Sequence, residues 1–546
     1  MPTPMQSVER DLDSMYQPLF NAKGNSVDSN DYASCDTELA LDYLLRDGTC
    51  ARRAGNQADS GSNAGEDGED EKKTSFWPLV LLIFLSVSAG PFGVEPAVAA
   101  GGPFIALLGF VVLPLVWSIP EALVTAELST TFPENAGCVV WVSTAYGPFW
   151  GWMEGYSNWV SGVADNSLYP VLFFGYLPSL LPEDSWLRDE GLRRWGCVVC
   201  VNVILCCLIY RGLRIIGRVA IAMALFSLLP FMIFVLWGLP QCTTPTSWLS
   251  PPDGGWGSIR WGTFLNVMFW KLNYFDKTFP VLDPGNTYPR ALLACVTLVV
   301  LSYALPVLVG TGSASVSAVA AAAESGIGDG LGASEREKGR WSLWVDGYFA
   351  VAAEAIAGRW LTVWIVLASA AANIGHYQSA MTSDALQVMG MAERGMLPAV
   401  FAKPGTSGIS GAAITASGIG VIALGMLGFQ DIVSILNVLY CFAGFLKFMA
   451  FVQLRTHHRD LQRPFEIPVG TVAVCAILFP SLCFIVVIAI SSSVKTWAVS
   501  GSMLLFGLGL YPGLRLAKHR EWFEFRDLTL YEGDIARPEN SALSGA

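Results

Sequence analysis

The sequence predicts an all-α integral membrane protein with about twelve transmembrane helices. Hydrophobic residues make up 53% of the 546 residues, charged residues only 14%, and the mean hydropathy is +0.47. From residue 76 onward, apolar runs long enough to cross a bilayer alternate with short polar loops. Because an ordinary soluble domain has about a quarter of its residues charged, this composition indicates a polytopic membrane protein.

The two ends of the chain differ from the apolar middle. Residues 1–75 are acidic and rich in Ser, Asn and Gly, so they cannot bury a core and are expected to be disordered. They lack the basic segment and short apolar run of a cleaved signal peptide. We expect a disordered cytoplasmic tail at 1–75, a transmembrane domain at 76–512 and a cytoplasmic C-terminal tail at 513–546.

The apolar runs give the positions of the expected spans. They lie near 77–100, 104–129, 138–176, 196–210, 215–238, 261–279, 290–311, 349–390, 411–428, 432–454, 470–490 and 494–512. The run at 138–176 is long enough to be tilted or broken, and 349–390 begins with an amphipathic lead-in. An even number of spans places both termini on the same side.

Lysine and arginine gather in the loops on one side of the predicted bundle. These residues are Lys72, Lys73, Arg211, Arg214, Arg218, Arg394, Lys403, Arg455, Arg459, Arg463, Arg515, Lys518 and Arg520. The positive-inside rule assigns that side to the cytoplasm. Arg188, Arg193 and Arg194 lie in a long opposite loop and count against the rule, which long loops follow weakly. We therefore expect both termini to be cytoplasmic.

The first span is interrupted near its middle. Gly90, Pro91, Gly93 and Pro96 break the helical hydrogen-bond pattern there, and Glu95 lies inside the break. A broken helix survives at membrane depth only against protein or a watery cavity, and an acid at that depth indicates a functional site. The alternative is a proline-kinked span with Glu95 at its watery end.

The sixth span shows a second interruption. It begins as an aromatic helix and turns polar at Lys271, Asn273 and Asp276. Interrupted hydrophobic segments at corresponding places in two halves indicate a transporter whose site lies between inverted repeats. The spacing of five helices between the two breaks fits that arrangement.

Carboxylates outnumber lysines in the predicted spans. The acids are Glu95, Glu121, Glu127, Glu154, Asp165, Asp276 and Asp384, and the lysines are Lys271 and Lys447. This excess suits a cationic substrate or a proton relay. Glu127 and Asp384, at span ends, are expected to lie in water.

Aromatic side chains accompany both breaks. Phe92, Trp270 and Tyr274 flank them, and Tyr169 and Tyr440 lie deep in other spans. Aromatic faces bind ammonium groups, although most aromatics in membrane proteins serve packing or the interfacial belt.

Proton coupling has two further candidates, and metal chemistry has none. His376 and Glu121 could carry protons, although a packing histidine is the equal alternative for His376. The 12 cysteines lie mostly in apolar runs and there are only four histidines. We expect no metal, no cofactor and no enzymatic site, because no nucleophile–base or metal-ligand spacing occurs. No basic patch indicates a nucleic-acid partner.

Several motifs resemble the polyamine:proton symporters of plants and trypanosomatid protozoa, in the amino acid–polyamine–organocation superfamily. They are GPFGVEP at 90–96, SIPEALVTAE at 118–127, FPENAG at 132–137, FWKLNYFD at 269–276, TYPRAL at 287–292, SDALQVMGMAERGMLP at 383–398 and FVQLRTHHRDLQRPFEIPVG at 451–470. The resemblance implies a LeuT-type fold of two five-helix inverted repeats plus two helices, with broken helices 1 and 6. It also implies uptake of putrescine or spermidine driven by protons.

The resemblance places the site residues. Gly90–Glu95 matches the unwound part of span 1, and Trp270, Asn273, Tyr274 and Asp276 match the substrate-facing part of span 6. The candidate substrate-binding residues are Gly90, Phe92, Gly93, Glu95, Glu154, Tyr169, Trp270, Asn273, Tyr274, Asp276 and Tyr440, and the candidate proton-coupling residues are Glu121 and His376.

The chain departs from the family pattern at three positions. Lys271 stands where the family usually has Asn, Phe275 where it has Trp, and Lys447 where it has an acid. We expect Lys271 or Lys447 to pair with a core acid such as Glu95 or Glu154.

Three functions follow from these patterns. The first is a proton-coupled polyamine importer of the plasma membrane, or alternatively of an internal membrane. The second is an amino acid permease of the same fold, with the substrate carboxylate on the amides of the broken helices. The third is a sensor or scaffold that transports nothing.

Overall fold

The computed structural model describes residues 76–526 apart from residue 89, residues 133–135, 182–190 and 212–217, residue 244, residues 277–286, 326–339 and 406–407, and residue 460. Within this part of the chain the regular elements are helices, with no strand. The expected tail at 1–75 and most of the expected C-terminal tail lie outside the described residues. The last residues of the predicted sixth span, 277–279, also lie outside the described residues.

The helices are joined by connections of very different lengths. In chain order they are α4 (Phe76–Val87), α5 (Glu95–Leu113), α6 (Ile119–Thr131), α7 (Cys138–Tyr146), α8 (Pro148–Tyr176), α9 (Leu192–Tyr210), α10 (Arg218–Gly238), α11 (Trp261–Leu272), α12 (Thr287–Gly312), α13 (Ala314–Ser325), α14 (Tyr348–Ala357), α15 (Arg359–Glu393), α16 (Gly411–Leu424), α17 (Phe429–His457), α18 (Thr471–Ser491) and α19 (Val494–His519). A π-helical turn, Pro114–Ser118, joins α5 to α6.

Several of these helices are long and apolar enough to cross a bilayer. Among the described residues the segments that meet both conditions are Glu95–Thr131, Leu192–Tyr210, Ile221–Gln241, Pro289–Gly312, Phe429–His457, Thr471–Ser491 and Val494–His519. Helices α8 and α15 are also long enough to cross a bilayer, at 29 and 35 residues, but they carry more polar side chains. The prediction of a polytopic all-α membrane protein is confirmed.

Glycines in the left-handed region set several boundaries between helices. Gly147, at φ +89°, divides the predicted span 138–176 into α7 and α8. Gly358, at φ +92°, separates the predicted lead-in, α14, from α15. Gly102, at φ +73°, kinks the chain between the predicted first and second spans, where a Cβ would lie 2.5 Å from the backbone nitrogen of Pro252. Only glycine satisfies both demands at that kink.

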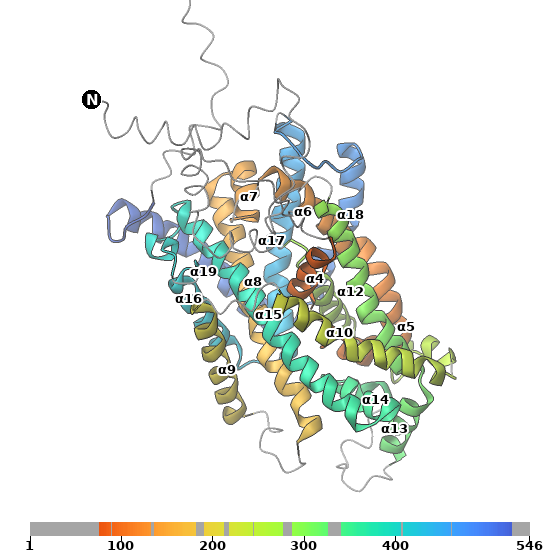
Figure 1. Cartoon of the computed structure of the whole chain (residues 1–546). Coiled ribbons are helices and arrows are strands. Elements are labelled where there is room, and N and C mark those ends of the chain that lie inside the picture. The colour runs from red at the N-terminus through yellow and green to blue at the C-terminus, as the bar shows by residue number, and fades with distance from the viewer. Residues whose placement is uncertain are drawn as a thin grey trace, which may run out of the picture.

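Helix α4 lies within the bundle, and other helices form its outer surface (Figure 1). It packs against α10, α12 and α15, and its Val80, Ile83 and Phe84 are buried. Helix α17 packs along α8, and α15 packs along α8 as well. In contrast, α18 and α19 expose apolar side chains such as Phe479 and Phe506, as expected for helices that face lipid. The interrupted first span is therefore surrounded by protein.

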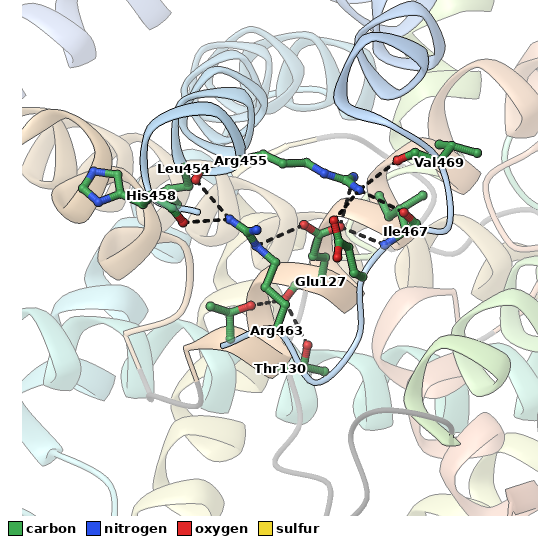
Figure 2. A network of polar contacts seen from close by, with 10 residues as sticks. Glu127, Thr130, Leu454, Arg455, His458, Arg463, Ile467 and Val469 are labelled. Carbon is green, nitrogen blue, oxygen red and sulfur yellow. Dashed lines mark hydrogen bonds and ion pairs between the residues drawn. The ribbon is translucent and has the colours of Figure 1, made fainter. Parts of the chain in front are cut away.

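A buried ion-pair network joins the end of α6 to the end of α17 (Figure 2). Glu127 pairs with Arg455 at 3.3 Å and with Arg463 at 3.4 Å, and the backbone N–H of Ile467 donates to it at 3.0 Å. Arg455 also donates to the carbonyl oxygens of Ile467 and Val469, each at 2.9 Å. The expectation that Glu127 lies in water is wrong, because its side chain is completely buried and paired with these donors.

Asp384 was the other acid expected in water, and it is buried too. It accepts a hydrogen bond from the side-chain amide of Asn166 at 2.7 Å, between α15 and α8. A Cβ at Gly162 would lie only 2.4 Å from its carboxylate, so the two helices approach closely there. Both corrections have the same cause: polar donors from other parts of the chain satisfy acids that the sequence alone places at span ends.

Candidate functional site

The helix of the first span is interrupted at the predicted position. Helix α4 ends at Val87 and α5 begins at Glu95. Between them Gly90 has φ +129° and Gly93 has φ +82°, conformations that L residues rarely adopt. The side-chain oxygen of Ser88 accepts the Gly90 N–H at 3.2 Å and thus satisfies one donor freed by the break. The prediction of a broken first helix is confirmed by this geometry.

Glu95 is fully buried at the start of α5 and is held by three donors. The backbone N–H groups of Gly93 and Gly347 donate to its carboxylate at 2.9 Å and 3.2 Å, and the Tyr176 hydroxyl donates as well. Its place at a helix N-terminus adds the favourable end of the helix dipole. These donors offset part of the cost of burying the carboxyl group, and they hold Glu95 in place as an acceptor inside the bundle.

The two interrupted spans meet at Gly93. A Cβ there would lie 3.1 Å from the ring of Trp270, which belongs to α11. Gly93 is therefore required twice, by its φ angle and by the close ring. This contact brings the acid of the first break and the aromatic end of the sixth span into one group. Phe92 completes that wall, because its ring packs edge-on against Tyr176 at a centroid distance of 5.2 Å.

Asp165 of α8 joins the same group through Trp270. The indole N–H donates to Asp165 at 2.8 Å, and the Tyr169 hydroxyl donates to the same carboxylate. Tyr169 in turn stacks on His376 at a centroid distance of 4.4 Å. His376 thus reaches the group through an aromatic contact. We call these residues the Glu95 group: Gly90, Phe92, Gly93, Glu95, Asp165, Tyr169, Tyr176, Trp270 and His376.

Lys271 is buried next to the Glu95 group without an ion pair among the described residues. Its ammonium lies 3.8 Å from the centroid of the Trp270 ring and 5.7 Å from that of Tyr303. The carboxylates of Asp165 and Glu95 attract it electrostatically, but none lies within ion-pair distance. Of the two lysines of which one was expected to pair with a core acid, Lys271 is therefore not the one that does so in this conformation. The ammonium instead uses a cation–π contact.

The second interrupted span ends its first half at Leu272. The freed carbonyl oxygen of Leu272 accepts the Ser118 hydroxyl at 2.7 Å. Asn273 is extended and completely buried, and neither atom of its side-chain amide has a hydrogen-bond partner among the described residues. Tyr274 has φ +68°, an uncommon value for a non-glycine residue, and its hydroxyl lies 3.1 Å from that of Ser161. Strain and unpaired polar atoms of this kind gather at functional sites.

A second group surrounds Lys447 of α17. Its ammonium is ion-paired with Asp276 and lies 3.9 Å from Glu121 and 3.2 Å from the Tyr440 hydroxyl. Glu121 also accepts the Tyr440 hydroxyl and the backbone N–H of Phe275, the latter at 3.2 Å. We call these residues the Lys447 group. The expected pairing of Lys447 with a core acid is confirmed, and Asp276 and Glu121 provide it.

Along the chain, Tyr274 lies between Trp270 of the Glu95 group and Asp276 of the Lys447 group. Its ring lies 4.7 Å from that of Tyr440 in the Lys447 group. Most of the predicted site residues thus fall into one of two adjacent groups. Glu154 of α8 and Asn273 belong to neither group, because each is completely buried without a side-chain hydrogen bond among the described residues.

Three residues that contact Glu95 or Trp270 are absent from the candidate substrate-binding residues: Asp165, Tyr176 and Gly347. Asp165, which the sequence analysis names only among the acids of the spans, gave a further signal, because it lies four residues before Tyr169 and so shares a helix face with it. Tyr176 and Gly347 gave none, since they are 81 and 252 residues from Glu95 along the chain. Contacts of that separation are a product of the fold.

Comparison with known proteins agrees with this geometry. The model of the amino acid permease family matches residues 75–509. Polyamine transporter PUT1 of Oryza sativa subsp. japonica is 42% identical over 469 residues, which cover 85% of this chain and 82% of that protein. Polyamine transporter RMV1 of Arabidopsis thaliana is 42% identical over 458 residues, covering 83% and 88%. The resemblance predicted from the motifs is confirmed, and the chain belongs to the amino acid permease family.

Proposed function

We propose that the protein is a secondary transporter that imports polyamines together with protons. The observation that carries this proposal is the contact of the two interrupted helices at Gly93 and Trp270, between the buried carboxylates of Glu95 and Asp165. Carboxylates and aromatic faces are the groups that bind alkyl ammonium ions in a low-dielectric site. Broken helices near mid-membrane are where transporters of this architecture place their substrate.

The charge of the interior supports a cationic substrate. Among the described residues the buried acids outnumber the buried lysines and arginines: Glu95, Glu121, Glu127, Glu154, Asp165, Asp276 and Asp384 against Lys271, Lys447 and Arg455. An interior with excess carboxylates is stabilised by cations or by protons. A polyamine is such a cation, and a co-transported proton can neutralise a further carboxylate.

Each group has a proposed part in the cycle. Glu95 and Asp165 bind a substrate ammonium, while Trp270, Phe92 and Tyr274 cover the methylene chain. Asp276 is paired with Lys447 in the described conformation, so we assign it to that pair. Glu121, which accepts the Tyr440 hydroxyl, is placed to affect gating or proton movement.

The names of the relatives point the same way. Both relatives are called polyamine transporters, and their similarity covers 85% and 83% of this chain. Family membership and the apolar spanning helices make this chain a membrane transporter in our proposal, and we expect no enzymatic site.

Uptake into liposomes tests the proposal. The purified full-length chain is reconstituted, the outside is made acidic relative to the lumen, and labelled putrescine is added. We expect saturable accumulation that a protonophore abolishes and that unlabelled spermidine competes. Saturable uptake independent of the pH gradient would refute proton coupling. No saturable uptake of any substrate in the panel would favour a sensor or scaffold.

We also propose that the protein lies in the plasma membrane with both termini in the cytoplasm. The basic loops, including those that carry Arg455 and Arg463, support this orientation. Epitope tags at either terminus should be reached by antibody only after the plasma membrane is permeabilised. Labelling of intact cells at either tag, or staining confined to an internal membrane, would contradict it.

A second candidate substrate is an amino acid, and Lys271 is the observation that favours it. Its buried ammonium lacks an ion-pair partner among the described residues, and a substrate carboxylate would supply one. The amine of the same substrate could then reach Glu95 or the unpartnered amide oxygen of Asn273.

Lys271→Asn separates the two candidates. If the substrate is a polyamine, the Lys271 ammonium competes with it for the face of the Trp270 ring, a cation–π contact of about 1 kcal/mol. Removing this ammonium should therefore raise the affinity for putrescine several-fold. If the substrate is an amino acid, arginine or leucine should compete with labelled substrate in the wild type and lose affinity in the variant. Lys495→Asn is the control, because Lys495 pairs with Asp431 in an exposed place.

A further inference from the structure

Glu154 is the buried carboxyl group that the proposed substrate site leaves unexplained. It is 0% exposed, and both of its carboxyl oxygens are buried without a hydrogen-bond partner among the described residues. An ionised carboxylate in such a place is strongly destabilised, because it loses its hydration and gains no donor. These surroundings favour the neutral, protonated form of Glu154.

Helix α8, which carries Glu154, packs along α17, which carries Lys447. Among the described residues, the charged side chains that act on Glu154 are Lys447 and Asp276, the latter in the second break. The thiol of Cys138, at the start of α7, also lies in the field of Glu154 and of the Lys447 group. Helices α15, α16 and α19 pack against α8 as well, but no described charged group on them acts appreciably on Glu154.

The Lys447 group has more carboxyl groups than its single ammonium can neutralise. Lys447 is already paired with Asp276 and lies 3.9 Å from Glu121, which the Tyr440 hydroxyl and the Phe275 N–H also support. Nothing comparable supports a charged Glu154. Once its proton leaves, the cation that acts on Glu154 among the described residues is Lys447.

We propose that Glu154 is a proton-binding site of the transport cycle and that Lys447 is the ammonium that replaces the proton. In this step the carboxyl O–H bond breaks and the proton passes to water. The carboxylate then accepts an N–H of Lys447, which leaves Asp276. Because Asp276 lies in the second break, loss of the proton changes how that break is anchored to α17. The inference rests on the proposed proton-coupled function.

A substitution that fixes the neutral state tests the proposal. Glu154→Gln keeps the shape of the protonated side chain but cannot release a proton. In liposomes with a pH gradient, we expect its accumulation of labelled putrescine and the accompanying lumenal acidification to fall to the level of empty liposomes. Exchange of labelled for unlabelled putrescine at equal pH should remain measurable. Wild-type accumulation and acidification in this variant would overturn the proposal.

Asp431→Asn is the matched control. It makes the same change from acid to amide at a partly exposed residue outside both groups. We expect accumulation, acidification and exchange to stay at wild-type values. If Glu154→Gln fails to fold, Glu154→Asp keeps a titratable carboxyl, and we expect it to restore gradient-driven accumulation. Absence of accumulation in a folded Glu154→Asp protein would count against the proposal.

Infrared spectroscopy tests the proton without relying on transport. The wild-type protein should show the carbonyl stretch of a protonated carboxyl that lacks a hydrogen bond, and Glu154→Gln should lack it. Asp276→Asn leaves Lys447 without its partner, so the band should be weaker than in the wild type at the same pH. A wild-type spectrum without the Glu154 band, or a band unchanged by Asp276→Asn, would overturn the proposal. If the wild type moves no polyamine but shows the band, only the proposed function fails.

Discussion

Glu95 and Glu154 are both completely buried glutamates, yet their surroundings are opposite. Glu95 accepts hydrogen bonds from Gly93, Gly347 and Tyr176, whereas neither oxygen of Glu154 has a partner among the described residues. Donors favour the charged form of a carboxyl group, and their absence favours the neutral form. The comparison teaches that burial alone does not assign a part in transport. Donors hold the carboxyl group of Glu95 in place, whereas none among the described residues does so for Glu154.

Glu95→Gln should break this comparison most strongly. The amide cannot carry a negative charge, and it sets an NH2 group against the N–H donors of Gly93 or Gly347, which leaves a buried donor unpaired. We expect both gradient-driven uptake and equal-pH exchange to fall to background, unlike the selective loss expected for Glu154→Gln. Uptake is measured at matched amounts of reconstituted protein. Wild-type rates in either assay would refute the assigned part of Glu95.

Glu127 offers a third environment, because arginines rather than neutral donors surround it. Glu127→Gln leaves Arg455 and Arg463 without their shared counter-charge in a buried place. Breaking a buried ion pair by removing one partner costs about 3–5 kcal/mol. The thermal unfolding midpoint in detergent should fall clearly, while Asp431→Asn, in an exposed pair worth at most about 1 kcal/mol, should leave it nearly unchanged. Equal midpoints for the two variants would contradict the structural part of the network.

Gly93→Ala tests the contact that joins the two breaks. The new Cβ would require a left-handed residue, at about 1–2 kcal/mol, and would press on the Trp270 ring at 3.1 Å. Gly147→Ala is the matched control, because Gly147 has φ +89° but nothing within 4 Å of its Cβ position. We expect uptake to fall more for Gly93→Ala than for the control. Equal losses would show that the ring contact has no importance for transport.

Tyr176→Phe should have the smallest effect of the series. It removes one of the three donors to Glu95 and leaves the two backbone N–H groups in place. A lost hydrogen bond of about 1 kcal/mol corresponds to about a fivefold reduction in the affinity for putrescine. Competition binding on the purified protein measures this change. A loss as large as that of Glu95→Gln would show that the hydroxyl contacts the substrate directly.

The interruptions were predictable because they arise from local chemistry. Gly90 and Gly93 can adopt φ angles closed to other residues, and the polar run from Lys271 to Asp276 cannot continue an apolar span. Local chemistry does not decide whether the segment 138–176 divides at Gly147. A single glycine within a long apolar run can either continue a helix or end it.

The partners of the buried acids were not predictable to the same degree. Lys447 was expected to pair with some acid, but the choice of Asp276 depends on how α17 lies beside the second break. Glu127 was misjudged because Arg463 and Ile467 reach it from a segment more than three hundred residues away. Hydropathy describes a residue's own span, whereas satisfaction of a charge depends on its neighbours in the fold.

The amide of Gly347 has a mechanical consequence. It lies just before α14 and donates to Glu95, 252 residues distant in sequence. Any outward displacement of this loop would strip one donor from the carboxylate at the same moment that it widened the route around it. Access to the Glu95 group and the hydrogen bonding of its carboxyl group would then change in a single movement.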